Sequence, residues 1–455
     1  MRFMSRTFKT VDYEKALDLT VSLRDVLPVG HLARFIVHVV AHLDLAPIYA
    51  GYAPRGGEAY APEILLGLLL YGYATGVFSS RKMERATYDS AAFRFIAGGL
   101  HPDHDTLATF RKTFLVELQS VFVDLLLLAQ DAGVLELGNI SLDGSKIHAD
   151  ASKSSAMSQQ RLLEREAQLR REVQEIFALA EQADQQVLPD GLIPADEIAR
   201  REDLLLRLDQ AKAVLAARAD ERYQAEKATY DAKLQEREQK AQRGGRHKPR
   251  GPAPKPPTPG PRDDDQYNFT DPDSRIMKSS RTGFEQCYNA QVAVDQASLL
   301  IVGQMLSNHP NDQQEAVPTV DAIPAELGRP PAAALDTGYF SASNVAALAA
   351  RGIEPYIATG REPHHQTWQE RFLDQPAPPS EDASPKVKMA YKLQTAIGKA
   401  IYRLRKCTVE PVIGMIKEVL GFRQFSLRGL AGAVGEWCLV CLAFNIKRLH
   451  VLLPG

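Results

Sequence analysis

The stretch LGNISLDGSKIHADAS, residues 137–152, decides the fold of this chain. Ile140 and Leu142 alternate with polar residues, which is the pattern of a short β-strand with one buried face. Asp143 follows at once, and the glycine after it predicts a turn. The residues before this stretch have a helical pattern, so we interpret it as the first strand of a new domain, with a carboxylate at the strand end.

Later stretches predict four more strands. Residues 285–308, EQCYNAQVAVDQASLLIVGQMLSN, contain two β-rich runs around the turn DQAS and predict a hairpin. Residues 331–352, PAAALDTGYFSASNVAALAARG, predict a strand that ends at Asp336 and then a helix. Residues 354–359, EPYIAT, predict one more strand. Strands that alternate with helices in this way predict an α/β fold, a mixed sheet flanked by helices.

The same patterns divide the chain into parts. Residues 157–239 are two long, charge-rich helical stretches joined at LPDGLIP, which is typical of an antiparallel helical hairpin. Residues 240–262 contain seven Lys or Arg, no acid and seven prolines, and this composition predicts a disordered basic tether. The expected domains are an N-terminal helical domain 1–137, the first part of the core 138–156, the inserted hairpin with its tether 157–262, and the remaining core with the C-terminal helices 263–455.

Composition indicates a soluble protein from a reducing compartment. The 455 residues are 45% hydrophobic and 24% charged. Four cysteines are too few for a disulfide framework, and the pair in CLVC, 438–441, lies in an apolar run that favours a core helix over a metal or redox site. The best membrane candidate, ILLGLLLYGYATGVF at 64–78, is shorter than the roughly 20 residues that span a bilayer. We therefore expect a cytoplasmic protein without membrane contact.

The C-terminal part of the chain is strongly basic, although the whole chain is not. Residues 386–428 contain ten Lys or Arg and two Glu, a charge of +8, in a chain of net charge −2. Such a segment predicts a local site for a polyanion such as nucleic acid. The basic side chains that we expect to contact its backbone are Lys399, Arg403, Arg405, Lys406 and Lys417.

One of the two acids in this segment, Glu410, stands directly before Pro411. Proline is tolerated in the first turn of a helix, so we expect a helix to begin near Glu410, where the helix dipole favours a negative charge. Lys417 follows two helical turns later and should lie on the same face. This face would carry a metal-binding carboxylate beside a phosphate-binding ammonium group.

Asp143, Asp336 and Glu410 together suggest a site. Carboxylates at strand ends point to the edge of a sheet where ligands bind in α/β proteins. Hard cations such as Mg²⁺ prefer oxygen ligands, and two such ions about 3.5–4 Å apart can activate an attacking oxygen and stabilise a leaving one. Each carboxylate alone is more often a cap or a solvated group, but the combination with the basic segment is much stronger evidence.

Four motifs resemble bacterial insertion-sequence transposases of the DDE type, and in particular the subgroup with a helical insertion after the first strand. They are SLDGSKIHADASK, DPDSRIMKSSRTGFEQCYNAQVAVD, ALDTGYFSASN and VEPVIGMIKEVLGFRQFSLRGL, and the resemblance covers nearly the whole chain. It implies an RNase H-like catalytic core in which Asp143, Asp336 and Glu410 match the catalytic, metal-binding Asp-Asp-Glu triad. It also implies that the helices of 1–137 bind the element's ends.

The chain departs from this family's C-terminal signature, which is Tyr, two residues, Arg, three residues, Glu, six residues, Lys. Glu410 and Lys417 match it. The Arg position holds Lys406, because Arg405 stands one residue early, and the Tyr position is shifted in the same way. The identity of the first two signature residues is therefore open, whereas the triad is intact.

The resemblance implies a function for the whole chain. It predicts a DNA transposase that uses two Mg²⁺ or Mn²⁺ ions to cleave at the ends of an insertion sequence and join the freed 3′-OH to target DNA. The implied partners are the terminal inverted repeats and the target DNA, with a homodimer in the DNA complex, in the bacterial cytoplasm at the nucleoid. Two alternatives remain: a metal-dependent nuclease without strand transfer, and an inactive or domesticated DNA-binding protein.

Some residues allow two interpretations. The helix that carries Arg111 and Lys112 could belong to a helix-turn-helix reader, in which case both side chains contact DNA, or to a helical packing domain. Lys146 could approach DNA, although a surface turn is the favoured interpretation. Glu436 is the other late acid that could compete with Glu410, but its apolar surroundings favour a buried, hydrogen-bonded role.

Overall fold

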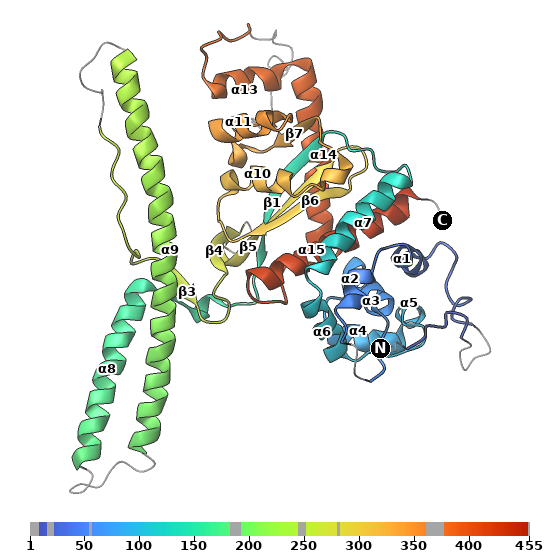
Figure 1. The fold of residues 1–455 in the computed structure, drawn as a ribbon, viewed down its shortest axis with the longest axis horizontal. Coiled ribbons are helices and arrows are strands. Elements are labelled where there is room, and N and C mark those ends of the chain that lie inside the picture. Colours follow the sequence, from blue (N-terminus) through green and yellow to red (C-terminus); the bar gives the residue numbers. More distant parts are fainter. Residues whose placement is uncertain are drawn as a thin grey trace, which may run out of the picture. The chain divides into compact units, whose positions relative to one another are not determined.

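The computed structural model describes residues 9–15, 22–53, 57–182, 193–243, 252–279, 283–360 and 377–453. The chain forms two compact units (Figure 1). The larger one comprises Met1–Asp150 and Asp273–Gly455, and the smaller one comprises Ala151–Pro272. The smaller unit is therefore an insertion into the sequence of the larger one.

The larger unit is built on a six-stranded mixed sheet with the order β4-β5-β1-β7-β8, in which β6 also pairs with β5. Strand β5 runs antiparallel to β1, β4 and β6, whereas β7 runs parallel to β1 and β8 runs parallel to β7. The strands are β1 (Ile140–His148), β4 (Arg275–Ser279), β5 (Gly283–Asp295), β6 (Ile301–Ser307), β7 (Ala332–Leu335) and β8 (Glu354–Ile357). The predicted RNase H-like mixed sheet flanked by helices is confirmed.

Strand β5 is the long central element of this sheet. It is buried without interruption from Gln286 to Asp295, as expected for a strand with neighbours on both edges and both faces covered. The predicted hairpin turn follows it: the buried Asp295 carboxylate accepts hydrogen bonds from the backbone N–H of Ser298 at 2.7 Å and of Gly138 at 3.1 Å. Asp295 is thus a structural residue that fixes the start of β1 to the hairpin.

Helices surround the sheet within the larger unit. Before β1 lie α1 (Leu32–Val40), α2 (Ala46–Ala50), α3 (Pro62–Ala74), α4 (Ser80–Asp89), α5 (Ala91–Ile96), α6 (His104–Thr113) and α7 (Glu117–Asp131). After β6 lie α10 (Ala316–Asp321), α11 (Ala342–Ala350), α13 (Pro385–Gln394), α14 (Ala396–Gly414) and α15 (Leu430–Leu452). Helix α15 packs against α3 and α7 on one side and against β6 on the other, so it joins the N-terminal helices to the sheet.

Helix α15 has the length and hydropathy of a membrane-spanning segment, but 72% of its apolar window is buried inside the protein. This burial is typical of the core helix of a globular fold. The cysteines of the CLVC motif, Cys438 and Cys441, are both buried in it, and burial raises the pKa of each thiol. The core-helix interpretation of this motif is therefore correct.

The smaller unit is a helical hairpin. It consists of α8 (Gln159–Gln182) and α9 (Pro194–Arg243), with a two-stranded sheet of β2 (Ala156–Ser158) and β3 (Gln266–Asn268). The helices are antiparallel, because Glu166 pairs with Lys212 at 2.5 Å and Glu172 pairs with Arg201 at 2.8 Å. The two helices pack through a hydrophobic cluster of buried residues, Leu162, Leu169, Leu208, Ala211 and Leu215. The predicted helical insertion is confirmed.

Residues 240–262 were predicted to be a disordered tether, but the parts of this segment that the structure describes have defined contacts. Helix α9 continues to Arg243, and the proline-rich residues 252–262 lie along α9. There Arg262 pairs with Glu226 at 2.7 Å, and Arg222 donates to the carbonyl of Gly260 at 3.2 Å. These contacts order an extended segment that could not pack by its own apolar residues, while 244–251 lie outside the described residues.

Arg111, which we expected to contact DNA, is instead buried. Its side chain is 8% exposed, it donates to the hydroxyl of Tyr73 at 2.8 Å, and it lies 3.8 Å from the fully buried carboxylate of Glu436. Tyr73 in turn donates to Glu436 at 2.6 Å, and the backbone N–H groups of Ser426 and Leu427 donate to the same carboxylate. The prediction for Arg111 is therefore wrong, whereas the buried structural role favoured for Glu436 is correct.

This cluster generates a prediction about stability. Arg111→Ala leaves the Glu436 carboxylate buried without its cation, so we expect a loss of about 3–5 kcal/mol in the free energy of unfolding. Its neighbour Lys112 is exposed, and Lys112→Ala is the matched control, with an expected change of about 0.5 kcal/mol or less. Denaturant unfolding measures both. Equal small effects would contradict the structural role of Arg111.

Candidate active site

The guanidinium of Arg405 lies among the three predicted carboxylates. Its Nη2 is 3.2 Å from Oδ2 of Asp143 and 3.4 Å from Oδ2 of Asp336, and its Nη1 is 2.8 Å from Oε1 of Glu410. The Arg405 side chain is 6% exposed, whereas those of Asp336 and Glu410 are 46% and 49% exposed. The fold thus gathers residues 143, 336 and 410 around one buried cation, with two of the carboxylates open to solvent.

The sheet sets the distance between the first two carboxylates. In the parallel pair of β1 and β7, Leu142 lies opposite Leu335, and the two aspartates follow these residues. Asp336 caps the next 3₁₀ turn by accepting a hydrogen bond from the backbone N–H of Gly338. The backbone register and this cap fix the position of Asp336 beside β1.

Asp143 does not end its strand, as the sequence suggested, but lies in the middle of β1. Strand β5 pairs with all of β1 and extends it to His148, so Gly144 is a strand residue and not a turn residue. A side chain at Gly144 would collide with Gln291 across the strand pair, because a Cβ there would come within 2.2 Å of the Gln291 amide. The glycine therefore makes room for Gln291.

Helix α14 brings the third carboxylate, and its start also differs from the prediction. The helix begins at Ala396 instead of near Glu410, and Pro411 lies inside it. Because Pro411 has no N–H, the backbone bond back to Cys407 is lost, and a π-helical turn at Met415–Val419 follows shortly after. Glu410 thus lies in the last turns of α14, so the dipole argument for its position does not hold.

Contacts with β1 on both sides of Glu410 fix this helix. The hydroxyl groups of Thr408 and Ser141, both buried, hydrogen-bond at 2.8 Å. On the far side, Lys417 donates to the backbone carbonyl of Lys146 at 3.1 Å. Lys417 therefore contacts β1, and this hydrogen bond holds the π-helical turn that follows α14 on the strand that carries Asp143.

The remaining residues that we predicted to contact DNA differ in the solvent exposure of their side chains. Lys399, Arg403 and Lys406 are exposed on α14 and carry charge toward solvent. Arg405 is buried and its charge is enclosed by carboxylates, so its predicted contact with DNA stays a prediction. Lys406 has the family spacing to Glu410, but it is Arg405 that reaches the carboxylates.

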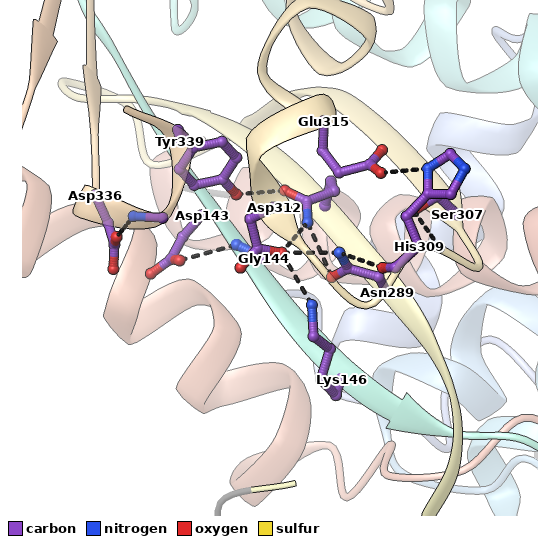
Figure 2. A network of polar contacts seen from close by, with 12 residues as sticks. Asp143, Gly144, Lys146, Asn289, Ser307, His309, Asp312, Glu315, Asp336 and Tyr339 are labelled. Atoms are coloured by element: carbon purple, nitrogen blue, oxygen red, sulfur yellow. Dashed lines mark hydrogen bonds and ion pairs between the residues drawn. The ribbon is translucent and has the colours of Figure 1, made fainter. Parts of the chain in front are cut away.

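A second polar network lies on the other side of β1, and the sequence analysis missed most of it (Figure 2). Asp312 accepts hydrogen bonds from Lys146 at 2.9 Å, from Asn289 at 2.8 Å and from Gln291 at 3.1 Å. Gln291 also accepts from the hydroxyl of Tyr339, just after Asp336. Lys146 is thus part of a strand and an ion pair, not of a surface turn. The available signal was two amide residues spaced by two, Asn289 and Gln291, in the buried middle of β5.

Burial and mutual repulsion change the acidity of this site. Burial raises the pKa of Asp143 from 3.8 to about 6, Arg405 and the Gly144 N–H oppose this rise, and Asp336 and Glu410 add to it. Burial also raises the pKa of Tyr339, with Asp143 and Asp312 adding to the effect. Burial therefore outweighs the adjacent guanidinium in setting the acidity of Asp143.

The donor set fits a hard divalent cation in its chemistry, because it offers carboxylate oxygens, two of them open to solvent. Its present arrangement is different: among the described residues, no group of three or more His, Cys, Asp or Glu is placed to hold a metal ion. The oxygens face Arg405 instead. Asp143, Asp336 and Glu410 would hold such an ion once they turn from the guanidinium.

The raised pKa of Asp143 predicts a pH-dependent stability. Because the folded-state pKa of about 6 exceeds the ordinary value of 3.8, Asp143 favours the folded state at low pH, and this contribution is lost as the pH rises through about 6. Asp143→Asn removes the buried charge, so we expect the metal-free protein to gain about 1–3 kcal/mol at about pH 8. Denaturant unfolding of wild type and variant between about pH 4 and 8 measures this.

The matched control is Asp150→Asn, which changes a partly exposed acid just beyond β1 that pairs with Arg428, and it should leave the pH profile unchanged. A destabilised Asp143→Asn at the highest pH would mean that the attraction to Arg405 outweighs the cost of burial.

Comparison with known proteins gives two family matches. Residues 255–446 match the model described as Transposase DDE domain, and residues 21–113 match the Transposase domain (DUF772). The first match includes Asp336 and Glu410, and Asp143 precedes it. Searches of curated proteins and of solved structures gave no significant match.

The two matched regions together cover more than half of the 455 residues. The DUF772 match lies before β1, and the DDE match covers the later strands, β4 to β8, and α14. DDE domains process nucleic acids and generally depend on divalent metal ions. The chain belongs to the insertion-sequence transposases of the DDE type.

Proposed function

We propose that this protein cleaves DNA at the ends of an insertion sequence and transfers the freed 3′-OH into target DNA, with Asp143, Asp336 and Glu410 as the catalytic and metal-binding residues. The observation that carries this proposal is the meeting of the three carboxylates at Arg405, although they come from β1, the end of β7 and α14. Two Mg²⁺ or Mn²⁺ ions, when bound, supply activation of the attacking oxygen and stabilisation of the leaving oxygen.

In this proposal the three carboxylates and the residues that position them have different roles. Asp143 is held rigidly in the middle of β1, so it provides the fixed reference point for the other two carboxylates. Asp336 and Glu410 are about half exposed and can meet a phosphodiester that approaches from solvent. Thr408 and Lys417 hold α14 against β1 and thereby keep Glu410 at a constant distance from Asp143.

Exposed basic residues beside the carboxylates supply the DNA contacts in this proposal. Lys399, Arg403 and Lys406 project from α14, the helix that carries Glu410. Lys112 is exposed on α6 and is a candidate contact for the N-terminal helices. We infer that terminal inverted repeats and target DNA are the substrates, that two copies act together on them, and that the protein works at the bacterial nucleoid in the cytoplasm.

The first test removes one carboxylate charge. Glu410→Gln keeps the size of the side chain but removes the charge that a divalent cation requires, so cleavage of labelled element-end DNA with Mg²⁺ or Mn²⁺ should fall by at least about 100-fold. Binding to the same DNA should persist, because Glu410 is half exposed and the basic residues are intact.

Glu418→Gln is the matched control, since it changes an acid on the same segment that pairs with Arg423 instead of Arg405. It should cleave normally. Normal cleavage by Glu410→Gln would remove Glu410 from the triad. Cleavage by wild type without joining to target DNA would favour a nuclease, and the absence of any cleavage would favour an inactive DNA-binding protein.

The second test concerns the salt dependence of DNA binding. Each basic residue that neutralises a phosphate releases counterions, so the slope of log affinity against log salt measures these contacts. Replacing Lys399, Arg403 and Lys406 by Ala should flatten this slope by about two to three. Changing Lys227, Lys233 and Arg207 of the inserted hairpin instead serves as a control of equal charge. An unchanged slope in the α14 variant would place the DNA elsewhere.

A further inference from the structure

Arg405 is held by the carboxylates themselves. Both of its terminal nitrogens contact the oxygens of Asp143, Asp336 and Glu410, while its Nε is buried without a hydrogen-bond partner among the described residues. A guanidinium has five N–H donors, and a buried donor without a partner is costly. The contacts that stabilise Arg405 in this place are therefore those with the three carboxylates.

The same carboxylate oxygens are the ones that a divalent cation needs. Oδ2 of Asp143, Oδ2 of Asp336 and Oε1 of Glu410 all face the guanidinium, and in this arrangement no group of three or more acids, His or Cys in the described part of the chain is placed to hold a metal ion. A guanidinium in contact with these oxygens repels a second cation brought to them and so lowers their affinity for a metal ion. Arg405 and the metal ion are thus alternative partners.

Phosphate offers Arg405 another partner. Guanidinium groups bind phosphate oxygens with two parallel hydrogen bonds, a geometry that carboxylates and phosphates share. The neighbouring residues Arg403 and Lys406 are exposed on the same helix and carry the charge that attracts a DNA backbone to it. Asp336 and Glu410 are about half exposed, so a phosphodiester that reaches these two carboxylates comes next to the guanidinium that they hold.

We propose that Arg405 is a positioning residue that holds the three carboxylates together in the DNA-free protein, competes there with divalent cations, and releases the carboxylates to metal when a DNA phosphate takes up its guanidinium. This inference rests on the proposed function, because it assumes that these carboxylates bind the metal. It predicts that metal and DNA strengthen each other's binding, because each removes the partner that opposes the other.

The test measures Mn²⁺ binding by the full-length protein without DNA. Electron paramagnetic resonance monitors the concentration of the free ion. Arg405→Gln removes the competing charge and should bind Mn²⁺ at least about tenfold more tightly than wild type. Arg403→Gln removes one positive charge from the same helix without touching the carboxylates, and it should change the Mn²⁺ affinity by less than about twofold.

A second measurement guards against a poorly folded variant. Without metal, Arg405→Gln should melt at a lower temperature than wild type because its carboxylates repel one another, and Mn²⁺ should raise its melting temperature more than that of wild type. A further experiment adds a mixed-sequence DNA duplex. The variant that combines Asp143→Asn, Asp336→Asn and Glu410→Gln measures the Mn²⁺ that binds to the DNA itself, and this background is subtracted. The duplex should tighten Mn²⁺ binding by wild type but not by Arg405→Gln.

The outcomes separate this inference from the proposed function. Equal Mn²⁺ affinities of wild type and Arg405→Gln, with binding that depends on the carboxylates, would overturn the competition and leave the metal site standing. Carboxylate-dependent binding that Arg403→Gln tightens as much as Arg405→Gln would reduce the effect to general electrostatics. If neither wild type nor any variant shows carboxylate-dependent Mn²⁺ binding, with or without DNA, both the competition by Arg405 and the proposed metal site are overturned.

Discussion

Strand β1 is the constraint on which the site depends. It pairs along its whole length with β5 and over its first three residues with β7, so its position in the sheet is fixed from both edges. A shift of its pairing by one residue would turn Asp143 to the opposite face of the sheet, because neighbouring side chains in a strand alternate. The face that Asp143 shares with Ser141 is the one on which α14 packs. The register of β1 therefore decides whether the carboxylates meet at all.

Three carboxylates in a small volume repel one another, and for Asp143 burial first and then this repulsion raise the pKa. In the metal-free protein Arg405 supplies one compensating charge from inside the fold, and its own pKa is raised because the attraction of the acids outweighs its burial. The arrangement lets the fold form with its three acids already gathered around one buried cation.

The sequence predicted the parts of the site that local patterns define. Five of the six strands of the large sheet, the hairpin and the meeting of the three carboxylates follow from alternation, turn residues and the positions of acids at changes of pattern, whereas β4 was not predicted. It failed where tertiary contacts decide. Gly144 was interpreted as a turn because its role, making room for Gln291, depends on a residue far along the chain. Pro411 was placed at a helix start because proline has a strong local preference there, whereas packing of α14 on β1 keeps the helix continuous through it.

Charge patterns were the least informative signal, for a physical reason. The +8 of residues 386–428 counts Arg405 with Lys399 and Lys406, although Arg405 is enclosed by acids and the other two are exposed. Arg111 and Lys112 are neighbours in sequence, yet one neutralises the buried Glu436 and the other faces solvent. A helix turns by about 100° per residue, so adjacent cations point in different directions. One can neutralise a buried acid while its neighbour faces solvent.

The segment after α14 explains how the fold keeps Glu410 in register with Asp143 despite the break at Pro411. Beyond the π-helical turn the chain returns to β1, where Phe425 donates its backbone N–H to the carbonyl of His148 at 2.8 Å. The next residues then donate to Glu436, the acid that Arg111 and Tyr73 hold in the core. Glu410 thus lies between two anchors, Ser141 on one side and the Lys146–His148 end of β1 on the other. A local loss of one backbone hydrogen bond in α14 can be absorbed between these anchors without moving the carboxylate away from the strand.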